Sequence, residues 1–280
     1  MRRTSSAATE AGRWLVYALV LLVFVGPFWG MVMTAFNGPT VRPGVLLLWP
    51  SDPTVEHFRF AFTQGHVWRY LLNSGVVVAF GTVLQVFVSA LAAYALARKR
   101  FTGAALVSLA ILSTMMMPEE VIAIPLYIVL GKLPLLNVSL LNSYLGMILP
   151  LVGWGFSIFV LTEFMRAIPV ELEEAARIDG ASELQVFFWI ILPLVRPALA
   201  TVTVFGFLMI WDQYLLPLIV TNREELYTLP VVLSTLRSDE TIRPNVFIAI
   251  TLLAMLPSIA MYLALQKAFN RGLLAGAVKG

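Results

Sequence analysis

The sequence predicts an all-α integral membrane protein with six transmembrane helices and both termini in the cytoplasm. Of the 280 residues, 59% are hydrophobic and only 12% are charged, whereas soluble domains carry about 25% charged residues. The apolar residues gather in runs long enough to cross a hydrocarbon core of ~30 Å. Lysines and arginines stand at the ends of these runs rather than in a clustered basic face, which argues against nucleic-acid binding.

A short cytoplasmic leader, residues 1–13, is expected to precede a single transmembrane domain, residues 14–280. A signal peptide has an apolar core of only ~7–15 residues. The first apolar run is longer, so we expect it to remain as a span. The six spans are predicted at about residues 14–36, 70–97, 104–130, 142–164, 194–220 and 246–269.

Two carboxylates, Glu119 and Glu120, lie inside the third predicted span, which Pro118 and Pro125 are expected to interrupt. A carboxylate at the centre of a membrane helix costs about 2.5–3.5 kcal/mol on insertion scales. Two interpretations follow. Either the helix breaks at Pro118 and the glutamates face a water-filled substrate cavity, or they reach the outer interface or pair with a basic residue. The fourth and sixth predicted spans contain Pro150 and Pro257, where we expect kinks.

A second polar group, Trp211-Asp212-Gln213-Tyr214, lies within the fifth predicted span. An ionisable residue inside a span is by default a candidate functional site. Aromatic rings beside hydrogen-bonding groups suit a sugar, because the rings stack on its apolar face and the polar groups bind its hydroxyls. The alternative is a structural hydrogen bond between helices.

A polar island, residues 166–193, separates the fourth and fifth predicted spans. Pro169 and the acidic residues after it suit the first turn of a helix, where carboxylates complement the helix dipole. Gly180 is the expected stop, and Ser182 is expected to cap a second helix that runs into Pro193. We therefore predict a helix–turn–helix on the membrane surface, with Ala175 and Ala176 left for a partner to pack against.

The positive-inside rule fixes the orientation. With both termini inside, cytoplasmic segments hold twelve of the 19 lysines and arginines, including the cluster Arg98-Lys99-Arg100, and outer loops hold seven. This orientation places the polar island in the cytoplasm, where a soluble partner can reach it.

Several kinds of chemistry are not expected in this chain. It has no cysteine, and its two histidines, His57 and His66, have no third ligand nearby, so no metal site is predicted. No phosphate-binding Gly-x-x-x-x-Gly-Lys-Ser/Thr motif occurs. No catalytic residues, and no cofactor bound by this chain, are therefore predicted, and the chain is not expected to be an enzyme.

The island also carries a family signature. Its residues resemble the EAA motif of bacterial ATP-binding-cassette importer permeases of the carbohydrate-uptake type, to which the maltose permeases belong; permeases of the sn-glycerol-3-phosphate type are the close alternative. The resemblance implies that this loop is a coupling helix that docks on an ATPase subunit. The matching residues are Glu174, Ala175, Ala176, Gly180, Ile190, Leu192 and Pro193.

The same resemblance implies the function, location and partners. A multi-pass permease of the bacterial cytoplasmic membrane would translocate a sugar or related carbohydrate together with a second, homologous permease subunit. Two ATPase subunits would bind ATP and Mg²⁺, and an extracytoplasmic solute-binding protein would deliver substrate. The tail, residues 271–280, also resembles the family and is expected to reach the ATPase; a plain cytoplasmic terminus is the alternative.

The resemblance is weaker at the polar group of the fifth span. Carbohydrate permeases often have Asn followed by an acid, whereas here Asp212 stands in place of the Asn and Gln213 in place of the acid. Two other functions are also considered. One is an ion-coupled secondary transporter that uses Glu119, Glu120 and Asp212, and the other is a structural membrane subunit.

Overall fold

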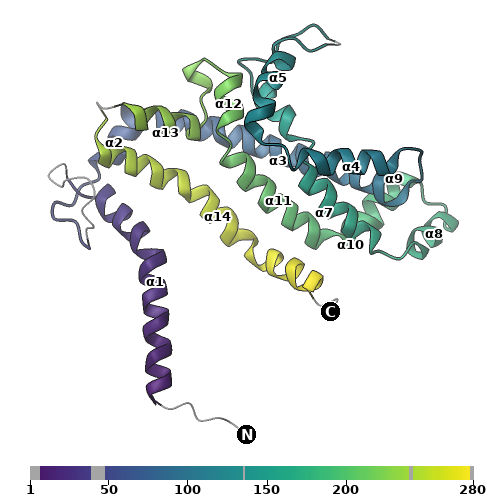
Figure 1. The fold of residues 1–280 in the computed structure, drawn as a ribbon, viewed down its shortest axis with the longest axis horizontal. Helices are drawn as coiled ribbons and strands as arrows, with labels where there is room; N and C mark the ends of the chain where they lie inside the picture. The colour runs from purple at the N-terminus through teal and green to yellow at the C-terminus, as the bar shows by residue number, and fades with distance from the viewer. Residues whose placement is uncertain (1–6, 39–47, 135, 240–241, 278–280) are drawn as a thin grey trace. The chain divides into compact units, whose positions relative to one another are not determined.

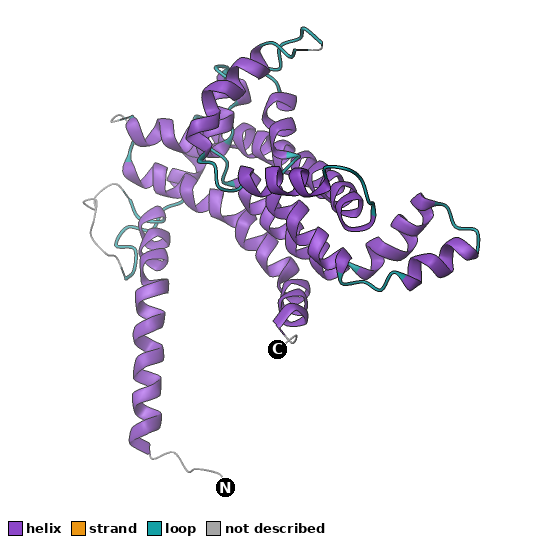
Figure 2. Ribbon diagram, turned by 45° about the vertical axis from the view of Figure 1, so that its right-hand side comes forward, coloured by secondary structure: helices purple, strands orange, loops and turns teal. Residues whose placement is uncertain are grey.

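The computed structural model describes residues 7–38, 48–134, 136–239 and 242–277 (Figure 1). This part of the chain consists of helices joined by turns and loops (Figure 2). An isolated antiparallel bridge joins Asn37 to Pro53. The prediction of an all-α chain is therefore confirmed.

Three helices are long and apolar enough to cross a membrane without a break. Each contains an 18-residue window with mean hydropathy above 2. They cover the first, second and sixth predicted spans, and the first begins within the segment predicted as a polar leader. The sixth runs through Pro257 as one element. These helices are α1 (Ala7–Ala35), α3 (Val67–Arg98) and α14 (Pro244–Ala277).

Three pairs of shorter helices could each supply one further span, giving up to six in the described part of the chain. The first pair is α4 (Ala104–Thr114) and α5 (Glu119–Gly131), which meet at 109°. Pro118 stands at the break in an extended conformation. Proline causes such a break because it has no N–H to donate to the helix and because it disfavours helix in the residue before it. The break expected at Pro118 is present. The expected interruption at Pro125 is wrong, because α5 continues through it.

The second pair covers the fourth predicted span. α6 (Tyr144–Ile148) runs into the 3₁₀ turn η1 (Leu149–Leu151), which then meets α7 (Gly155–Arg166) at 41°. Pro150 lies in the 3₁₀ turn, before the bend. The span is therefore bent, but the bend falls at residues 152–154 rather than at Pro150, where it was expected.

The fifth predicted span differs from expectation. A helical run formed by α9 (Glu183–Gln185), η2 (Val186–Ile191) and α10 (Leu192–Leu194) meets α11 (Arg196–Trp211) at 79°. The chain then leaves the helix at Asp212 and resumes in α12 (Leu215–Val220). The prediction of one helix over residues 194–220 is wrong: the apolar run starts earlier, bends beside two prolines, and breaks at the polar group.

The remaining helices are α2 (Glu56–Thr63), α8 (Glu171–Ile178), the 3₁₀ turn η3 (Glu224–Leu226) and α13 (Leu229–Ser238). The chain divides into two compact units. The first contains residues 1–68 and 233–255, and the second contains residues 69–232 and 256–280.

In the first unit, Asn37 is fully buried and joins three segments. Its side-chain oxygen accepts hydrogen bonds from the backbone N–H groups of Ser51 (2.7 Å) and Asp52 (3.1 Å). Its carbonyl accepts one from Asn245 Nδ2 and contacts His57 Nε2, both at 2.8 Å. Buried polar groups need such partners, so His57 lies in a structural hydrogen-bond network.

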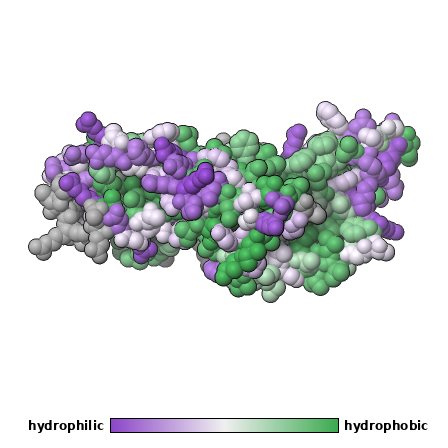
Figure 3. Space-filling model, turned by 90° about the horizontal axis from the view of Figure 1, so that it is seen from above, coloured by the Kyte–Doolittle hydropathy of each residue, from purple (hydrophilic) through white to green (hydrophobic). Residues whose placement is uncertain are grey.

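The second unit holds the core that supports α8. Side chains from α3, α7, η2 and α11 pack together there, and the ring of Tyr94 lies 5.2 Å from that of Phe187. Figure 3 shows hydrophilic residues over the end that carries α8, beside a broad hydrophobic surface. The buried members of this core are Ala90, Ala93, Tyr94, Leu161, Met165, Val186, Phe187, Ile191, Val195, Ala198 and Val202.

Candidate functional site

The first half of the candidate site is α8, which forms as predicted. Its first turn carries Glu171, Glu173 and Glu174, whose negative charges complement the positive end of the helix dipole. The helix ends at Ile178 and is capped by Asp179, and Gly180 follows with a left-handed φ of 88°. Two hydrogen bonds close the end, from Gly180 N to the Arg177 carbonyl (3.1 Å) and from Ala181 N to the Ala176 carbonyl (2.9 Å). This is the Schellman pattern, which favours glycine at this position.

The second half begins at Ser182, also as predicted. Its hydroxyl accepts a hydrogen bond from the N–H of Gln185 (3.4 Å), and the Gln185 side chain accepts one from the N–H of Ser182 (2.7 Å). These two bonds form a capping box, which satisfies two otherwise unpaired donors at the start of the helix. The turn between the two helices is therefore defined on both sides by side-chain and backbone hydrogen bonds.

Ile190, Leu192 and Pro193 lie where a π-helical turn, η2, passes into α10. Proline cannot donate to the carbonyl four residues earlier, and its ring crowds that carbonyl, here the one of Trp189. A wider π turn before Pro193 relieves this conflict, and such turns occur often at functional sites. All three residues are half-buried, and Leu192 packs against the core of the second unit.

The two sides of α8 have different surroundings. Leu172, Ala175 and Ile178 follow one another at helical spacing, and all three are exposed, Ile178 to 86%. Glu174 is exposed as well, whereas Ala176 packs partly against the core of its own unit. The surface available to a partner therefore includes Ala175 but only part of Ala176. An exposed apolar stripe on a short charged helix suits a protein partner.

Salt bridges hold the inner side of α8 against the rest of its unit. Glu173 is 1% exposed, and its carboxylate forms an ion pair with Arg98 at the end of α3. Arg177 contacts the second oxygen of Glu173 at 3.2 Å and bonds to Glu183 at 3.1 Å. The hydrogen bond to Glu183 raises the pKa of the Arg177 guanidinium. Sequence reasoning did not find this network, although Arg98 was recognised as a cytoplasmic marker, because its members come from separate segments.

The residues predicted for a substrate pathway lie at the two breaks. Glu119 and Glu120 are exposed at the first turn of α5, directly after Pro118. Asp212 and Tyr214 are exposed in the non-helical segment between α11 and α12. The first group begins α5, the second directly precedes α12, and α12 packs against α5.

The other members of the second group are more enclosed. Trp211 is the last residue of α11 and is 6% exposed, and its ring stacks on Phe207 with 6.1 Å between centroids. Gln213 is half-buried. Residues 212–214 are not helical, so the polar group lies at a break and not on the face of a continuous helix.

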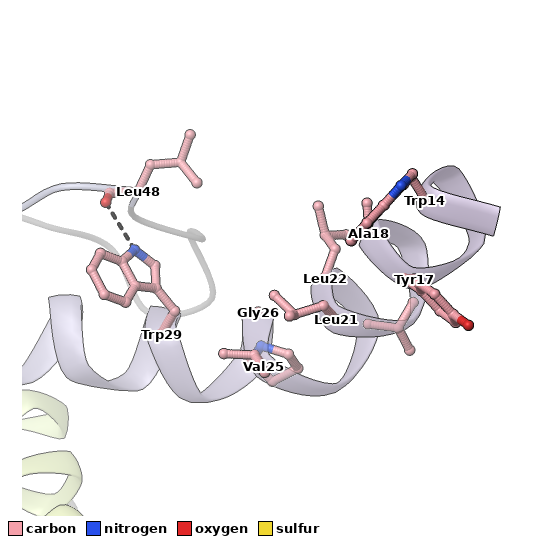
Figure 4. Close-up of a pocket in the computed structure, with 11 residues that line it drawn as sticks. Trp14, Tyr17, Ala18, Leu21, Leu22, Val25, Gly26, Trp29 and Leu48 are labelled. Atoms are coloured by element: carbon pink, nitrogen blue, oxygen red, sulfur yellow. Dashed lines mark hydrogen bonds between the residues drawn. The ribbon is translucent and has the colours of Figure 1, made fainter. Parts of the chain in front are cut away.

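A groove along α1 has a different character. Its lining is almost wholly apolar, and the indole Nε1 of Trp29 donates to the carbonyl of Leu48 at 3.0 Å (Figure 4). The side chains of Trp14, Leu22 and Phe24 are each at least 69% exposed. This surface lacks the convergent polar groups of a sugar site and suits lipid or another apolar helix.

The fold and the site together define a helical membrane subunit that presents a short surface helix. Residues 85–274 match the family described as "Binding-protein-dependent transport system inner membrane component". The chain belongs to this family. It is therefore a multi-pass permease subunit of the inner membrane and acts in transport rather than in catalysis.

The chain resembles its relatives along nearly its whole length. It is 31% identical over 274 residues to the arabinooligosaccharides transport system permease protein AraQ of Halalkalibacterium halodurans, covering 95% of this chain and 96% of that protein. It is 35% identical over 270 residues to the diacetylchitobiose uptake system permease protein DasC of Streptomyces coelicolor, covering 95% and 96%.

A solved structure has the same fold. It is described as a bacterial ABC transporter involved in the import of the acidic polysaccharide alginate. The likeness has a TM-score of 0.81 at 24% identity and covers 96% of this chain and 99% of that one.

Proposed function

We propose that this chain is a permease subunit of an ATP-binding-cassette importer for a sugar or oligosaccharide, and that α8 is the helix on which an ATPase subunit docks. The observation that carries the proposal is the two-sided environment of α8. Its inner side is bonded to the end of a long apolar helix, and its outer side exposes Leu172, Ala175 and Ile178. A helix built in this way can receive a soluble partner and pass its movement to the spans.

The expected membrane orientation supports this role. With six spans and both termini inside, α8 lies on the cytoplasmic side, where ATP is available. The triple-basic segment at the end of α3, Arg98-Lys99-Arg100, lies on the same side under the positive-inside rule. The ATP and Mg²⁺ are bound by the two ATPase subunits, and this chain contributes no nucleotide site.

The substrate class follows from the relatives and from the breaks. The names of AraQ and DasC assign them to arabinooligosaccharides and diacetylchitobiose. In this chain, exposed hydrogen-bonding groups stand at both breaks, at Glu119 and Asp212, with the aromatic Tyr214 beside the second. Non-helical backbone at membrane depth is tolerated where it lines a cavity or is buried in protein, so these breaks are the proposed substrate pathway.

The partners complete the transporter. A second, homologous permease subunit and lipid cover the exposed apolar face of α1, and an extracytoplasmic binding protein delivers the sugar. ATP binding closes the ATPase pair, moves α8 and opens the pathway to the outside. ATP and the loaded binding protein shift this equilibrium only by their differential affinity for the two states.

Two measurements test this proposal: which proteins copurify with the chain, and which solutes stimulate their ATP hydrolysis. The tagged chain is extracted from its native membrane, and ATP hydrolysis is measured with the binding protein and a panel of oligosaccharides, monosaccharides and glycerol phosphates. We expect an ATPase to copurify and one saccharide to stimulate it. Stimulation by sn-glycerol-3-phosphate alone would change the substrate class, and solute uptake that follows an ion gradient without an ATPase would contradict the proposal.

A charge reversal on the outer face of α8 tests the docking surface. Glu174→Lys places a positive charge beside the stripe formed by Leu172, Ala175 and Ile178, so we expect the chain to insert normally but to retain at least about 10-fold less ATPase. Glu56→Lys is the matched control, because it makes the same change at an exposed glutamate in the first turn of another helix, α2, and should retain as much ATPase as the parent chain. Equal retention of ATPase by Glu174→Lys and the parent chain would show that α8 is not the docking site.

A further inference from the structure

We infer that a compact ionic clamp at the end of α3 is the link that transmits movement of α8 to the membrane spans, and that the buried Glu173, rather than the exposed Glu174, is the positioning residue of this link. The clamp consists of Tyr94, Arg98, Lys99, Glu173, Arg177 and Glu183. The inference rests on the proposed docking of an ATPase on α8 and identifies how that docking acts on the rest of the chain.

Glu173 forms the inner layer of the clamp. One carboxylate oxygen pairs with Nε of Arg98, and the other is 3.2 Å from Arg177 and 3.4 Å from the hydroxyl of Tyr94. Arg98 also donates to the backbone carbonyl of Ile168 at 2.8 Å. A single guanidinium on α3 therefore binds both the start of the loop and the first turn of α8.

Glu183 forms the outer layer. It accepts from Lys99 at 2.6 Å, from Nε of Arg177 at 3.1 Å, and from the hydroxyl of Tyr94 at 3.1 Å. Tyr94 lies in the last turns of α3 and Lys99 directly follows that helix, whereas Glu183 begins the next helical run. The end of α3 thus holds both arms of the helix–turn–helix, and Arg177 joins the two layers.

Burial separates the roles of the inner and outer pairs. The side chains of Arg98 and Glu173 are 6% and 1% exposed, whereas those of Lys99 and Glu183 are 44% and 51% exposed. A buried ion pair is weak evidence for stability, because apolar residues of similar volume often serve as well. The two residues of the inner pair also form directional hydrogen bonds, however: Arg98 donates to the Ile168 carbonyl, and Glu173 accepts from Arg177 and from Tyr94. These bonds fix the orientation of α8 against α3. We therefore assign the inner pair to positioning.

The test measures transmission separately from assembly. The chain contains no cysteine, so Met116→Cys introduces a single thiol at the break between α4 and α5, where Met116 is exposed. In the complete complex in proteoliposomes, the rate of labelling by a membrane-impermeant maleimide is measured with and without ATP. The amount of retained ATPase and its rate of hydrolysis are measured in the same preparation.

Glu173→Gln keeps the volume and removes the charge. We expect ATPase retention and hydrolysis within about 3-fold of the parent, while the ATP-dependent change in labelling falls about 10-fold, a typical size for lost coupling. The matched control is Glu163→Gln, which removes the same charge from an exposed pair with Arg166 and should leave the labelling change intact. Adding Arg98→Gln to Glu173→Gln replaces the ions with two amides and should restore part of the change.

The outcomes separate the clamp from the proposed function. A labelling change that survives in Glu173→Gln overturns the clamp alone. No ATP response in the parent chain overturns the proposed function and the clamp with it. If Glu173→Gln does not accumulate, Glu183→Gln in the exposed outer layer takes its place: a reduction of about 3-fold in the ATP response supports the clamp, and an unchanged response overturns it.

Discussion

Glycine is required at residue 180 for a reason of backbone conformation rather than space. Its φ is 88°, and a Cβ there would meet no atom within 4 Å. Only the left-handed conformation therefore opposes substitution, and that conformation costs an L-residue about 1–2 kcal/mol. Asparagine tolerates it better than alanine does, and proline cannot adopt it because its ring holds φ near about −65°.

The order of stability at this position is therefore predictable. We expect Gly180→Asn to be mildly destabilising, Gly180→Ala to cost about 1–2 kcal/mol, and Gly180→Pro to abolish ATPase retention by disrupting the turn. Thermal unfolding of the solubilised complex and the amount of copurified ATPase measure these effects. Gly153→Ala is the control, since Gly153 is exposed, has no left-handed φ and also has open space. A Gly180→Ala chain as stable as the Gly153→Ala chain would contradict the argument.

Gly206 is constrained by space instead. A Cβ on Gly206 in α11 would overlap the side-chain amide of Gln85 in α3. Gln85 is fully buried and donates to the hydroxyl of Ser157 in α7. The glycine thus allows three helices to meet around one polar side chain, as small residues do in membrane helix packing.

Gly206→Ala is expected to destabilise the chain by about 1–3 kcal/mol through overpacking. Displacing the Gln85 amide from Ser157 adds to this cost, because a buried donor then lacks its acceptor. The combined variant Gly206→Ala with Gln85→Ala should recover much of the loss. Thermal unfolding of the solubilised complex measures the midpoints of the single and combined variants. Gly75→Ala is the control, because Gly75 also lies in a helix and a Cβ added there would meet no atom within 4 Å. Equal midpoints for Gly206→Ala and Gly75→Ala would rule out the clash.

At the scale of elements, the capping box at Ser182 decides where the second arm of the site begins. It precedes Glu183, which the clamp uses. Ser182→Ala removes the hydroxyl acceptor, and loss of such a cap costs about 1 kcal/mol. We expect backbone amides of residues 183–186 to exchange with deuterium about 5-fold faster.

The controls for this measurement lie in the same chain. Ser182→Asp keeps an acceptor at the cap and should retain slow exchange. Ser238→Ala removes a hydroxyl that bonds within its own helix, to the carbonyl of Ser234, and should leave residues 183–186 unaffected. Unchanged exchange in Ser182→Ala would mean that packing of the following helix, rather than the cap, fixes this end.

Local signals made the helix–turn–helix predictable from the sequence, because an acidic first turn, a glycine stop and a serine cap act within a few residues of one another. The long spans were predictable for a similar reason, since α3 is a continuous apolar run that ends in Arg98. The break at Pro118 also had a local cause in the missing N–H of proline.

Other features depend on contacts that no local pattern reveals. The break at Asp212 contains neither proline nor glycine itself. Pro217, which cannot bond to the Gln213 carbonyl, stands in the first turn of α12, so its position alone does not mark where α11 ends. Glu173 and Glu174 are adjacent acids with opposite environments, and only the position of Arg98 on another helix distinguishes them. The substrate-pathway residues remain predictions, as do the roles of Glu174, Ala175 and Gly180 toward a partner.

At the scale of the whole molecule, function depends on which side of the membrane α8 faces. Twelve of the 19 lysines and arginines lie in segments assigned to the cytoplasm, and three of them stand together where α3 ends. Basic residues near span ends are retained in the cytoplasm. The ionic clamp ties α8 to this same basic end, so the orientation of α3 determines that of α8.

Single-cysteine labelling tests this orientation, because the parent chain has no cysteine. Asp179→Cys places a thiol in the exposed turn after α8, and Ser139→Cys places one in the exposed loop after α5. In right-side-out membrane vesicles, a membrane-impermeant maleimide should label Ser139→Cys at once and Asp179→Cys only after permeabilisation. The reverse pattern would put α8 outside, beyond the reach of any ATPase in the cytoplasm. Labelling of both variants before permeabilisation would place both segments outside the membrane. The six-span topology, which has one span between them, would then be wrong.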